Sequence, residues 1–373
     1  MRDKFDAIVI GLGSMGSAAA YHLARRGLSV LGLEQFDLVH TKGSHHGATR
    51  LIRKAYFEHP DYVPLIERAS QLWGDLEEQA QRELLVQSGV VIFAPPESAV
   101  LAGVRHSAAL HELPIEEVRA ELLAERFPDF ALPKDYEAIF EADSGFLHVE
   151  AGVRAHLDAA REEGAVLLDN KAVLAWNKHA QGIDVVCEDL TYCCKQLLLC
   201  AGAWSASLSD VEHFPIQVHR QIQAWFKGRE GFDVKSGSPC FAFDLPQGFH
   251  YGFPDIDGSG IKFACHEKGL CLKSADERDA SGIDDEVKAL GGVLEKHVPG
   301  VSKAALRARE CLYTMTPDQH FIIDQHPEAE QVFLATGFSG HGYKFAPVIG
   351  EQLAELMCNG APSIPMDFLK LRF

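Results

Sequence analysis

A glycine-rich motif near the start of the chain restricts the fold more than any other feature of the sequence. The motif Gly11–Gly16 reads G-x-G-x-x-G and directly follows an apolar, β-branched run over 5–10 that predicts a buried parallel strand. An Ala-rich segment over 17–26 predicts a helix, and 29–33 predicts a second strand that ends at Glu34. A strand, a helix and a strand with this motif in the first turn are typical of a βαβ unit that binds a dinucleotide.

Each part of this motif has a physical task in such a unit. The first glycine permits the tight turn, the second lets the backbone approach a pyrophosphate, and the third lets the helix and strand pack closely. The helix N-terminus offers free N–H groups to the phosphates, and the acid after the second strand accepts a hydrogen bond from a ribose hydroxyl. A glycine-rich turn in an ordinary α/β fold is the alternative. The residues expected to contact the dinucleotide are Gly11, Gly13, Ser14, Met15, Gly16 and Glu34.

Two later glycine loops indicate which dinucleotide the chain binds. A glycine follows the strand-like run 196–200 at Gly202, and the glycine-rich loop 337–342 follows a strand predicted over 332–335. Three distant segments that converge on one cofactor suit FAD, a long ligand that needs cover along its length. The late loop also precedes a helix predicted over 347–358, so its N–H groups can lie near a flavin ring. Either later loop alone is more often just a turn, and NAD is the alternative cofactor.

Composition excludes several classes of protein. Of the 373 residues, 47% are hydrophobic and 24% are charged, as in ordinary folded domains, and the formal charge of −18 argues against nucleic-acid and anionic-membrane partners. No apolar run approaches the ~20 residues of a membrane span, and the N-terminal residues do not resemble a secretory signal. Nine cysteines without a C-x-x-C pair predict reduced thiols in the cytoplasm and no metal site.

The order of the predicted elements indicates a nucleotide-binding domain that is interrupted by a second domain. After Glu34 the chain does not return directly to a third strand; a helix over 62–84 follows, and the next helix and strand of the nucleotide-binding type are at 150–163 and 165–168. We expect an α/β FAD-binding domain with a discontinuous Rossmann-like fold and an α+β substrate-binding domain with a mixed sheet. The FAD-binding domain would comprise 1–84, 145–215 and 310–373, and the substrate-binding domain would comprise 85–144 and 216–309.

Five segments carry a specific resemblance to a known family. They are Ser44–Arg53 (SHHGATRLIR), Tyr251–Pro254, Cys311–Thr314, His320–Asp324 and Gly337–Phe345 (GFSGHGYKF). In the same order and at similar spacing, they resemble the monomeric sarcosine oxidase family, which includes N-methyltryptophan oxidase. Weaker likenesses at 145–147, 224–225 and 274–278 point to the N-methyltryptophan oxidase branch. The resemblance implies a two-domain FAD-dependent amine oxidase of the DAO type that acts as a monomer.

The resemblance also implies that FAD is bound covalently through a cysteine thioether, and the matching residue is Cys311. From the residues alone, a cysteine in a reduced chain is usually a small core residue, and we interpret the other eight in this way. A covalent link would fix an electron-withdrawing substituent on the flavin and prevent loss of the cofactor.

Two arginines and a lysine are candidate anion ligands. Arg50 and Arg53 lie three apart beside two histidines, and a solvated basic turn is their ordinary interpretation. In an acidic flavoprotein, such a pair is better interpreted as an anion site, because a guanidinium can hold a carboxylate through two hydrogen bonds. The resemblance implies that Arg53 and Lys344 bind the substrate carboxylate, and that Arg50 lies beside the flavin.

Lys262 lies in an apolar, alternating segment, where a lysine is costly to bury unless it has a task or a partner. If this segment is a strand, Lys262 and His266 face the same side. The resemblance implies that Lys262 faces the flavin and assists its reaction with oxygen, since a fixed ammonium stabilises developing negative charge. It also implies that His266 and Tyr251 line the substrate pocket and that His341 borders the flavin.

Together these observations predict an oxidase that demethylates an N-methyl amino acid to the amino acid, formaldehyde and hydrogen peroxide. Its partners would be molecular oxygen and a secondary amine that carries a carboxylate. The alternatives are an oxidase of another secondary amine, such as pipecolate or a fructosyl amino acid, an NAD-dependent dehydrogenase, and a flavin-binding protein without turnover. His45 and His46 lack a third ligand at a convincing spacing, so no metal is expected. The further residues expected to contact FAD are Arg50, Val173, Gly202, Cys311, Gly340, His341, Gly342 and Lys344.

Overall fold

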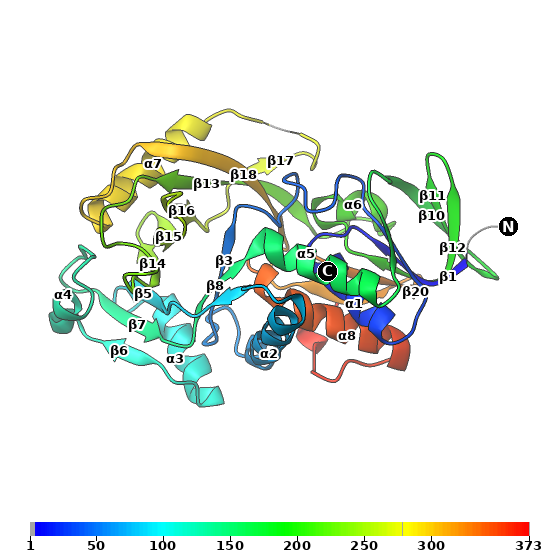
Figure 1. Cartoon of the computed structure of the whole chain (residues 1–373), viewed down its shortest axis with the longest axis horizontal. Helices are drawn as coiled ribbons and strands as arrows, with labels where there is room; N and C mark the ends of the chain where they lie inside the picture. The colour runs from blue at the N-terminus through cyan, green and yellow to red at the C-terminus, as the bar shows by residue number, and fades with distance from the viewer. Residues whose placement is uncertain (1–3, 278, 373) are drawn as a thin grey trace.

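The computed structural model describes residues 4–277 and 279–372, which form two large sheets with helices packed on them (Figure 1). In Figure 1 the blue N-terminal strand and helix and the red C-terminal helix lie together in the right half of the view, whereas the cyan and yellow segments lie in the left half. Segments from both ends of the chain therefore build one half of the molecule, as the predicted discontinuous fold requires.

The first sheet contains the βαβ unit. Its strand order is β10-β11-β12-β1-β2-β9, with β20 paired to β12 and β19 paired to β20. β1, β2, β9, β12 and β20 run parallel, whereas β10, β11 and β19 are antiparallel to their neighbours. The strands are β1 (Lys4–Ile10), β2 (Val30–Leu33), β9 (Val166–Leu168), β10 (Val173–His179), β11 (Gly182–Cys187), β12 (Thr191–Leu199), β19 (Ile322–His326) and β20 (Ala329–Thr336).

Strand β1 is apolar throughout its buried part because both of its faces are covered. Ala7 and Val9 belong to the core beneath the helices, whereas Ile8 and Ile10 belong to a second core on the opposite face. This alternation explains why the sequence reads as a continuous apolar run. The helices that share the first core are α1 (Ser14–Arg25), α2 (Tyr62–Ala80), α5 (Val149–Glu162) and α8 (Ala346–Asn359).

The second large sheet is mixed. Its order is β17-β13-β16-β15-β14-β5-β7-β6, with β18 also paired to β13, and α7 (Ile283–His297) packs against it. Its strands are β5 (Val90–Ala94), β6 (Glu116–Val118), β7 (Glu137–Glu141), β13 (Gln217–Phe226), β14 (Cys240–Leu245), β15 (Gly248–Phe253), β16 (Ile261–Cys265), β17 (Leu270–Leu272) and β18 (Ala305–Met315). The remaining elements are α3 (Ala99–His111), α4 (Leu123–Arg126), α6 (Ser205–Leu208) and a small sheet of β3 (Thr49–Ile52), β4 (Leu85–Val86) and β8 (Gly145–His148).

The predicted fold class is confirmed, and two predicted helix ends are wrong. α1 begins at Ser14, three residues earlier than expected, directly after the glycine turn. α2 ends at Ala80 because Gln81 adopts the left-handed conformation. The Glu77 carboxylate then accepts hydrogen bonds from the backbone N–H groups of Leu84 and Leu85, which lie beyond the helix. The division into domains at the stated residue numbers stays a prediction; its boundary at 309/310 falls inside β18. Among the described helices none is long and apolar enough to cross a membrane.

Candidate active site

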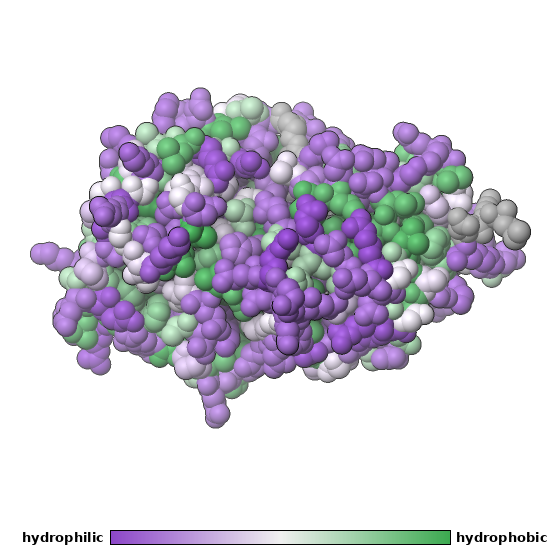
Figure 2. Space-filling model, viewed as in Figure 1, coloured by the Kyte–Doolittle hydropathy of each residue, from purple (hydrophilic) through white to green (hydrophobic). Residues whose placement is uncertain are grey.

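A cavity of about 320 Å³ lies at the carboxyl ends of β1 and β2. The three glycine segments that the sequence predicts to converge all contribute to its wall, as do β3 and β18. Figure 2 shows apolar residues at the surface around the position of α6, and Leu208 of that helix also lines the cavity. The predicted cofactor residues in the wall are Gly11, Gly13, Ser14, Met15, Glu34, Arg50, Val173, Gly202, Cys311, Gly340 and Gly342.

The glycines of the motif are required by space as well as by backbone conformation. Gly11 has φ +87°, and a Cβ there would lie 2.5 Å from the carbonyl oxygen of Cys200. A Cβ on Gly16 would lie 1.8 Å from the carbonyl oxygen of Gly11, so this glycine allows α1 to pack against β1. Gly16 is thus placed behind the cavity wall, where it shapes the turn.

The N-terminus of α1 faces the cavity with free donors. Its first residue, Ser14, follows Gly13, which makes no side-chain capping bond among the described residues. Ser14 and Met15 line the cavity, so the unpaired N–H groups and the positive end of the helix dipole are available to an anion there. This arrangement fits a pyrophosphate, and the long cavity beside it fits a dinucleotide.

Glu34 holds the turn that follows β1. Its carboxylate accepts hydrogen bonds from the backbone N–H groups of Leu12 at 2.9 Å and Phe36 at 3.1 Å, and His40 Nε2 lies 3.3 Å away. Burial opposes ionisation, but the His40 contact and the backbone donors outweigh it and lower the pKa of Glu34. Glu34 is therefore an ionised acceptor in the cavity wall, as a ribose-binding residue must be.

Cys311 and Arg50 meet in the wall of the same cavity. Cys311 is 1% exposed on β18, and its Sγ lies 3.5 Å from Nη2 of Arg50. The guanidinium is fixed by the carbonyl oxygens of Ser44 and Thr49, each 2.8 Å from one of its nitrogens. Burial alone would lower the pKa of Arg50, but the neighbouring Cys311 thiol and two tyrosine hydroxyls raise it, so the guanidinium stays charged.

A second, smaller cavity of about 60 Å³ adjoins the first, since Arg50, Gly340 and Tyr343 line both. The residues that the sequence predicts for substrate binding line it, and so does His341, which was predicted to border the flavin. Glu58, Phe57 and Phe249, which sequence reasoning missed, are also in its wall. The predicted residues found here are Arg53, Tyr251, His266, His341 and Lys344.

Arg53 is already paired in this structure. Its Nη2 lies 2.8 Å and 2.7 Å from the two carboxylate oxygens of Glu58, and its guanidinium lies over the rings of Phe57 and Tyr56, at 4.0 Å and 4.4 Å. Burial would raise the pKa of Glu58, but the Arg53 charge lowers it to about 2. The position of Glu58, five residues after Arg53, was the only available signal for this pair in the sequence.

Lys344 is a buried ammonium without a carboxylate partner in the described part of the chain. Its Nζ donates to the carbonyl oxygen of His341 at 3.1 Å and lies 3.5 Å from the Tyr56 hydroxyl. Burial, followed by repulsion from Arg53, lowers the pKa of Lys344 to about 7, despite the opposing effect of Glu58. An anion that entered the second cavity would therefore gain an ion pair that the protein itself does not supply.

The two histidines of this cavity are neutral. Burial lowers the pKa of His266 to about 4, and its Nδ1 lies 3.2 Å from the Tyr313 hydroxyl. Burial also lowers the pKa of His341 to about 3. Nε2 of His341 carries the proton, because it lies 3.0 Å from the carbonyl oxygen of Gln319, and Nδ1 therefore accepts a hydrogen bond from the Tyr56 hydroxyl at 2.6 Å. Neutral imidazoles and tyrosine hydroxyls can orient an uncharged amine by hydrogen bonds.

Lys262 is 2% exposed and is not among the described residues that line either cavity. Its Nζ donates to the carbonyl oxygens of Gly47 at 2.7 Å and Thr49 at 2.8 Å, and burial followed by the Arg50 charge lowers its pKa well below the usual range. β16 ends at Cys265, so His266 lies one residue beyond the strand, although its backbone N–H still donates to the carbonyl oxygen of Phe249 on β15. Lys262 lies over the ring of Phe253 and His266 contacts the ring of Tyr251, so both side chains lie on one face of the sheet.

The turn that receives Lys262 depends on a residue that sequence reasoning missed. Glu150, in the first turn of α5, accepts hydrogen bonds from the backbone N–H groups of Gly47 at 2.8 Å and Ala48 at 3.1 Å. Its carboxylate thus orients the turn whose carbonyl groups hold the buried ammonium.

The fold and the first cavity define a dinucleotide-dependent oxidoreductase. The family model described as FAD dependent oxidoreductase (DAO) matches residues 6–356, and the chain belongs to this family. The chain is 39% identical to the monomeric sarcosine oxidase of Streptomyces avermitilis, over 100% of this chain and 98% of that protein. It is 38% identical to the N-methyl-L-tryptophan oxidase of Salmonella arizonae, over 99% and 98% of the two chains. The resemblance inferred from the sequence is confirmed, and membership of this family implies FAD as the cofactor in place of the alternative, NAD.

Solved structures extend the likeness to the whole fold. The structure of NikD, titled an unusual amino acid oxidase essential for nikkomycin biosynthesis, has a TM-score of 0.87 at 23% identity, covering 99% of this chain and 97% of that one. Glycine oxidase from Geobacillus kaustophilus has a TM-score of 0.82 at 18% identity, covering 99% of both chains. At these identities the comparison shows that the chains share a fold.

Proposed function

We propose that the protein is an oxidase that removes the N-methyl group of an N-methyl amino acid. One N-methyl amino acid, one O₂ and one water would give the primary amino acid, formaldehyde and hydrogen peroxide. Full-length similarity to a sarcosine oxidase and to an N-methyl-L-tryptophan oxidase supports this reaction class. We further propose that the enzyme acts as a monomer in the cytoplasm.

The observation that carries the proposal is the buried ammonium of Lys344 in the second cavity, which has no carboxylate partner among the residues that the structure describes. A substrate carboxylate placed there would raise the lysine pKa again and complete the charge balance with Arg53 and Glu58. Tyr251 and His266 would hold the amine in the same cavity, because both line it and neither carries a charge at neutral pH. The site therefore fits a secondary amine with a carboxylate better than a simple amine.

FAD fits the first cavity on the evidence of the glycine turn, the uncapped α1 N-terminus and the ionised Glu34. When bound, FAD supplies the acceptor for a hydride equivalent from the substrate carbon and passes electrons on to oxygen. Gly11, Gly13 and Ser14 would hold its phosphates. Cys311 would anchor it covalently, as the family segment implies.

Lys262 would stabilise negative charge that develops on oxygen as it is reduced. Burial lowers the pKa of Lys262, but negative charge that develops nearby would favour its protonated form. Two carbonyl groups hold its nitrogen in an enclosed, low-dielectric position, where a charge acts more strongly than in water. Arg50 lies near this position and adds a second fixed positive charge.

The test is a panel of amines assayed with the purified holoenzyme for both peroxide and formaldehyde. Sarcosine, N-methyl-L-tryptophan, pipecolate and a fructosyl amino acid would be compared at equal concentrations. The proposal predicts that N-methyl amino acids give peroxide and formaldehyde in equal amounts. Peroxide without formaldehyde, and only from pipecolate or the fructosyl compound, would assign the enzyme to another secondary amine.

A further inference from the structure

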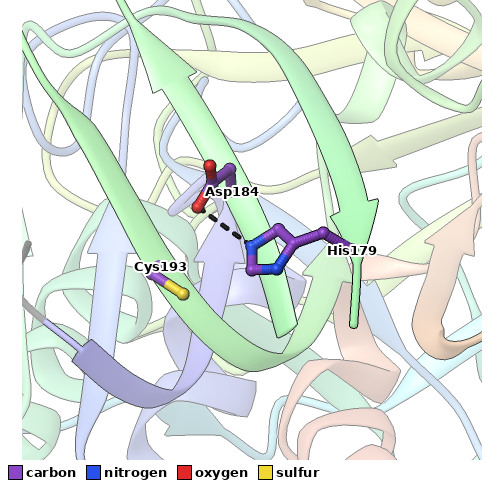
Figure 3. A group of neighbouring side chains, drawn as sticks. All are labelled: His179, Asp184 and Cys193. Atoms are coloured by element: carbon purple, nitrogen blue, oxygen red, sulfur yellow. Dashed lines mark hydrogen bonds and ion pairs between the residues drawn. The ribbon is translucent and has the colours of Figure 1, made fainter. Parts of the chain in front are cut away.

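A group of three side chains with metal-binding chemistry lies on the antiparallel edge of the first sheet, away from both cavities. His179 ends β10, Asp184 lies on β11, and Cys193 lies on β12. Figure 3 shows that the three side chains come from three neighbouring strands and point toward one another. Each residue offers one possible ligand atom, and the three atoms all lie within 4.8 Å of one another.

The strand register produces this meeting. Asp184 is the direct partner of Cys193 across β11 and β12, so their side chains share a face of the sheet. Gly182 is the partner of His179 across β10 and β11, which places His179 diagonally opposite Asp184 on that same face. The spacing of the histidines and cysteines along the sequence predicts no metal site, but strand pairing brings these three residues together.

We propose that His179, Asp184 and Cys193 form a zinc-binding site, with water as the fourth ligand. An imidazole, a carboxylate and a thiolate are the ligands that Zn²⁺ takes in proteins, and a mixture of these donors does not suit Mg²⁺ or Ca²⁺. Tetrahedral ligands around Zn²⁺ lie about 3.5 Å apart, so the three side chains need only small rotations to close on an ion. The thiol gives its proton to solvent as the ion binds.

Two neighbouring residues prepare the site for this role. Gln181 presents both a backbone N–H at 3.2 Å and a side-chain oxygen at 3.1 Å to Nδ1 of His179, so either tautomer of the ring is satisfied. Nε2 now lies 3.2 Å from a carboxylate oxygen of Asp184, to which its N–H donates; in the other tautomer Nδ1–H donates to Gln181 and the Nε2 lone pair is available to a metal. A Cβ on Gly182 would lie 2.3 Å from the carbonyl oxygen of Cys194, so a glycine here lets β11 lie close to β12 beside the thiol of Cys193.

The burial of the group favours a structural ion that holds the edge strands together. Cys193 is 5% exposed, whereas the His179 and Asp184 side chains are 32% and 18% exposed, so an ion can enter from solvent and keep one water. Val173 lines the first cavity at the start of β10, and His179 lies six residues further, roughly 20 Å away along the strand. The site is thus separate from the proposed chemistry, and turnover should not depend on it.

The test is a calorimetric titration of the chelator-treated holoenzyme with Zn²⁺. We expect one ion per chain, and a loss of affinity larger than ~10-fold in both His179→Ala and Cys193→Ser, because even an outer partner of a metal ligand is worth 10–100-fold. His213→Ala and Cys271→Ser are matched controls on an exposed histidine and an exposed thiol, and they should bind as the wild type does. The flavin spectrum and kcat of each variant report folding.

A second measurement identifies the ligand directly. Co²⁺ added to the holoenzyme should produce a thiolate-to-cobalt charge-transfer band in the difference spectrum, and Cys193→Ser should lack it. The proposal is wrong if Zn²⁺ does not bind, or if folded His179→Ala and Cys193→Ser bind it with wild-type affinity. It is also wrong if the cobalt band disappears in Cys271→Ser instead.

Discussion

Replacing Lys344 by methionine should remove the preference of the enzyme for substrates with a carboxylate. Methionine keeps the length of the buried side chain and removes the ammonium that lacks an ion-pair partner among the described residues. A charge-assisted contact of this kind contributes about 1.5–3 kcal/mol, which corresponds to a factor of about 10 to 160. We expect kcat/KM for an N-methyl amino acid to fall by that factor, while kcat/KM for its decarboxylated analogue changes little.

The lowered pKa of Lys344 gives the same assignment a second, independent signature. The free lysine titrates near pH 7 and loses its charge as the pH rises, whereas a bound carboxylate would favour the charged form. Inhibition by propionate, which has no amine to titrate, should therefore weaken above pH 7 by up to about tenfold per pH unit. In Lys344→Met the inhibition constant should be weaker and nearly independent of pH.

The matched control is Lys54→Met, which removes a positive charge from a partly exposed lysine near the cavity that pairs with Asp143. Steady-state kinetics of both substrates, measured by peroxide release, would be compared in wild type, Lys344→Met and Lys54→Met. Equal losses for both substrates in Lys344→Met would mean that the lysine serves the cofactor or the fold, and the carboxylate assignment would be refuted. A wild-type pH profile that persists in the mutant would refute the assignment of the titration to Lys344.

Three further changes test other parts of the site. Cys311→Ser should yield protein whose flavin is released when the protein is precipitated with acid. If the precipitated mutant is as yellow as the precipitated wild type, another residue anchors the flavin. Lys262→Met should slow flavin reoxidation, measured by stopped flow, by at least tenfold, which requires an increase of only ~1.4 kcal/mol in the activation barrier. Flavin reduction by substrate should slow much less. Equal slowing of both half-reactions would reject the oxygen role. Glu58→Gln should lower the free energy of unfolding by about 3 kcal/mol at pH 6, because the pKa of Glu58 is lowered to about 2 in the folded protein. This loss of stability is fully present above pH 4.5 and shrinks as the pH falls toward 2. A loss that stays constant over this pH range would contradict the ion-pair explanation.

The sequence alone determined the cofactor-binding half of this protein, because the signals there are local. The turn at Gly11 requires a positive φ, the third glycine must lie against the backbone, and the apolar run of β1 reflects burial on both faces. The constraints on the turn act between positions 11 and 16, and the apolar run of β1 can be read directly from the sequence although the segments that cover it are distant. The resemblance singled out Arg53, Lys344 and Cys311, which lie in the walls of the two cavities, but it gave no information about which charges are paired.

The tertiary structure decided which charges are paired and which residues meet across the sheets. Arg53 is neutralised by Glu58, whereas Lys344 has no carboxylate partner within residues 4–277 and 279–372. Both facts depend on how the segment after β3 and the segment before α8 meet at one cavity. The end of α2 and the meeting of His179 with Cys193 likewise depend on contacts that no periodicity records. A side-chain pKa and a ligand set are properties of spatial neighbours, and such neighbours can be far apart along the chain; Arg53 and Lys344, for example, are 291 positions apart.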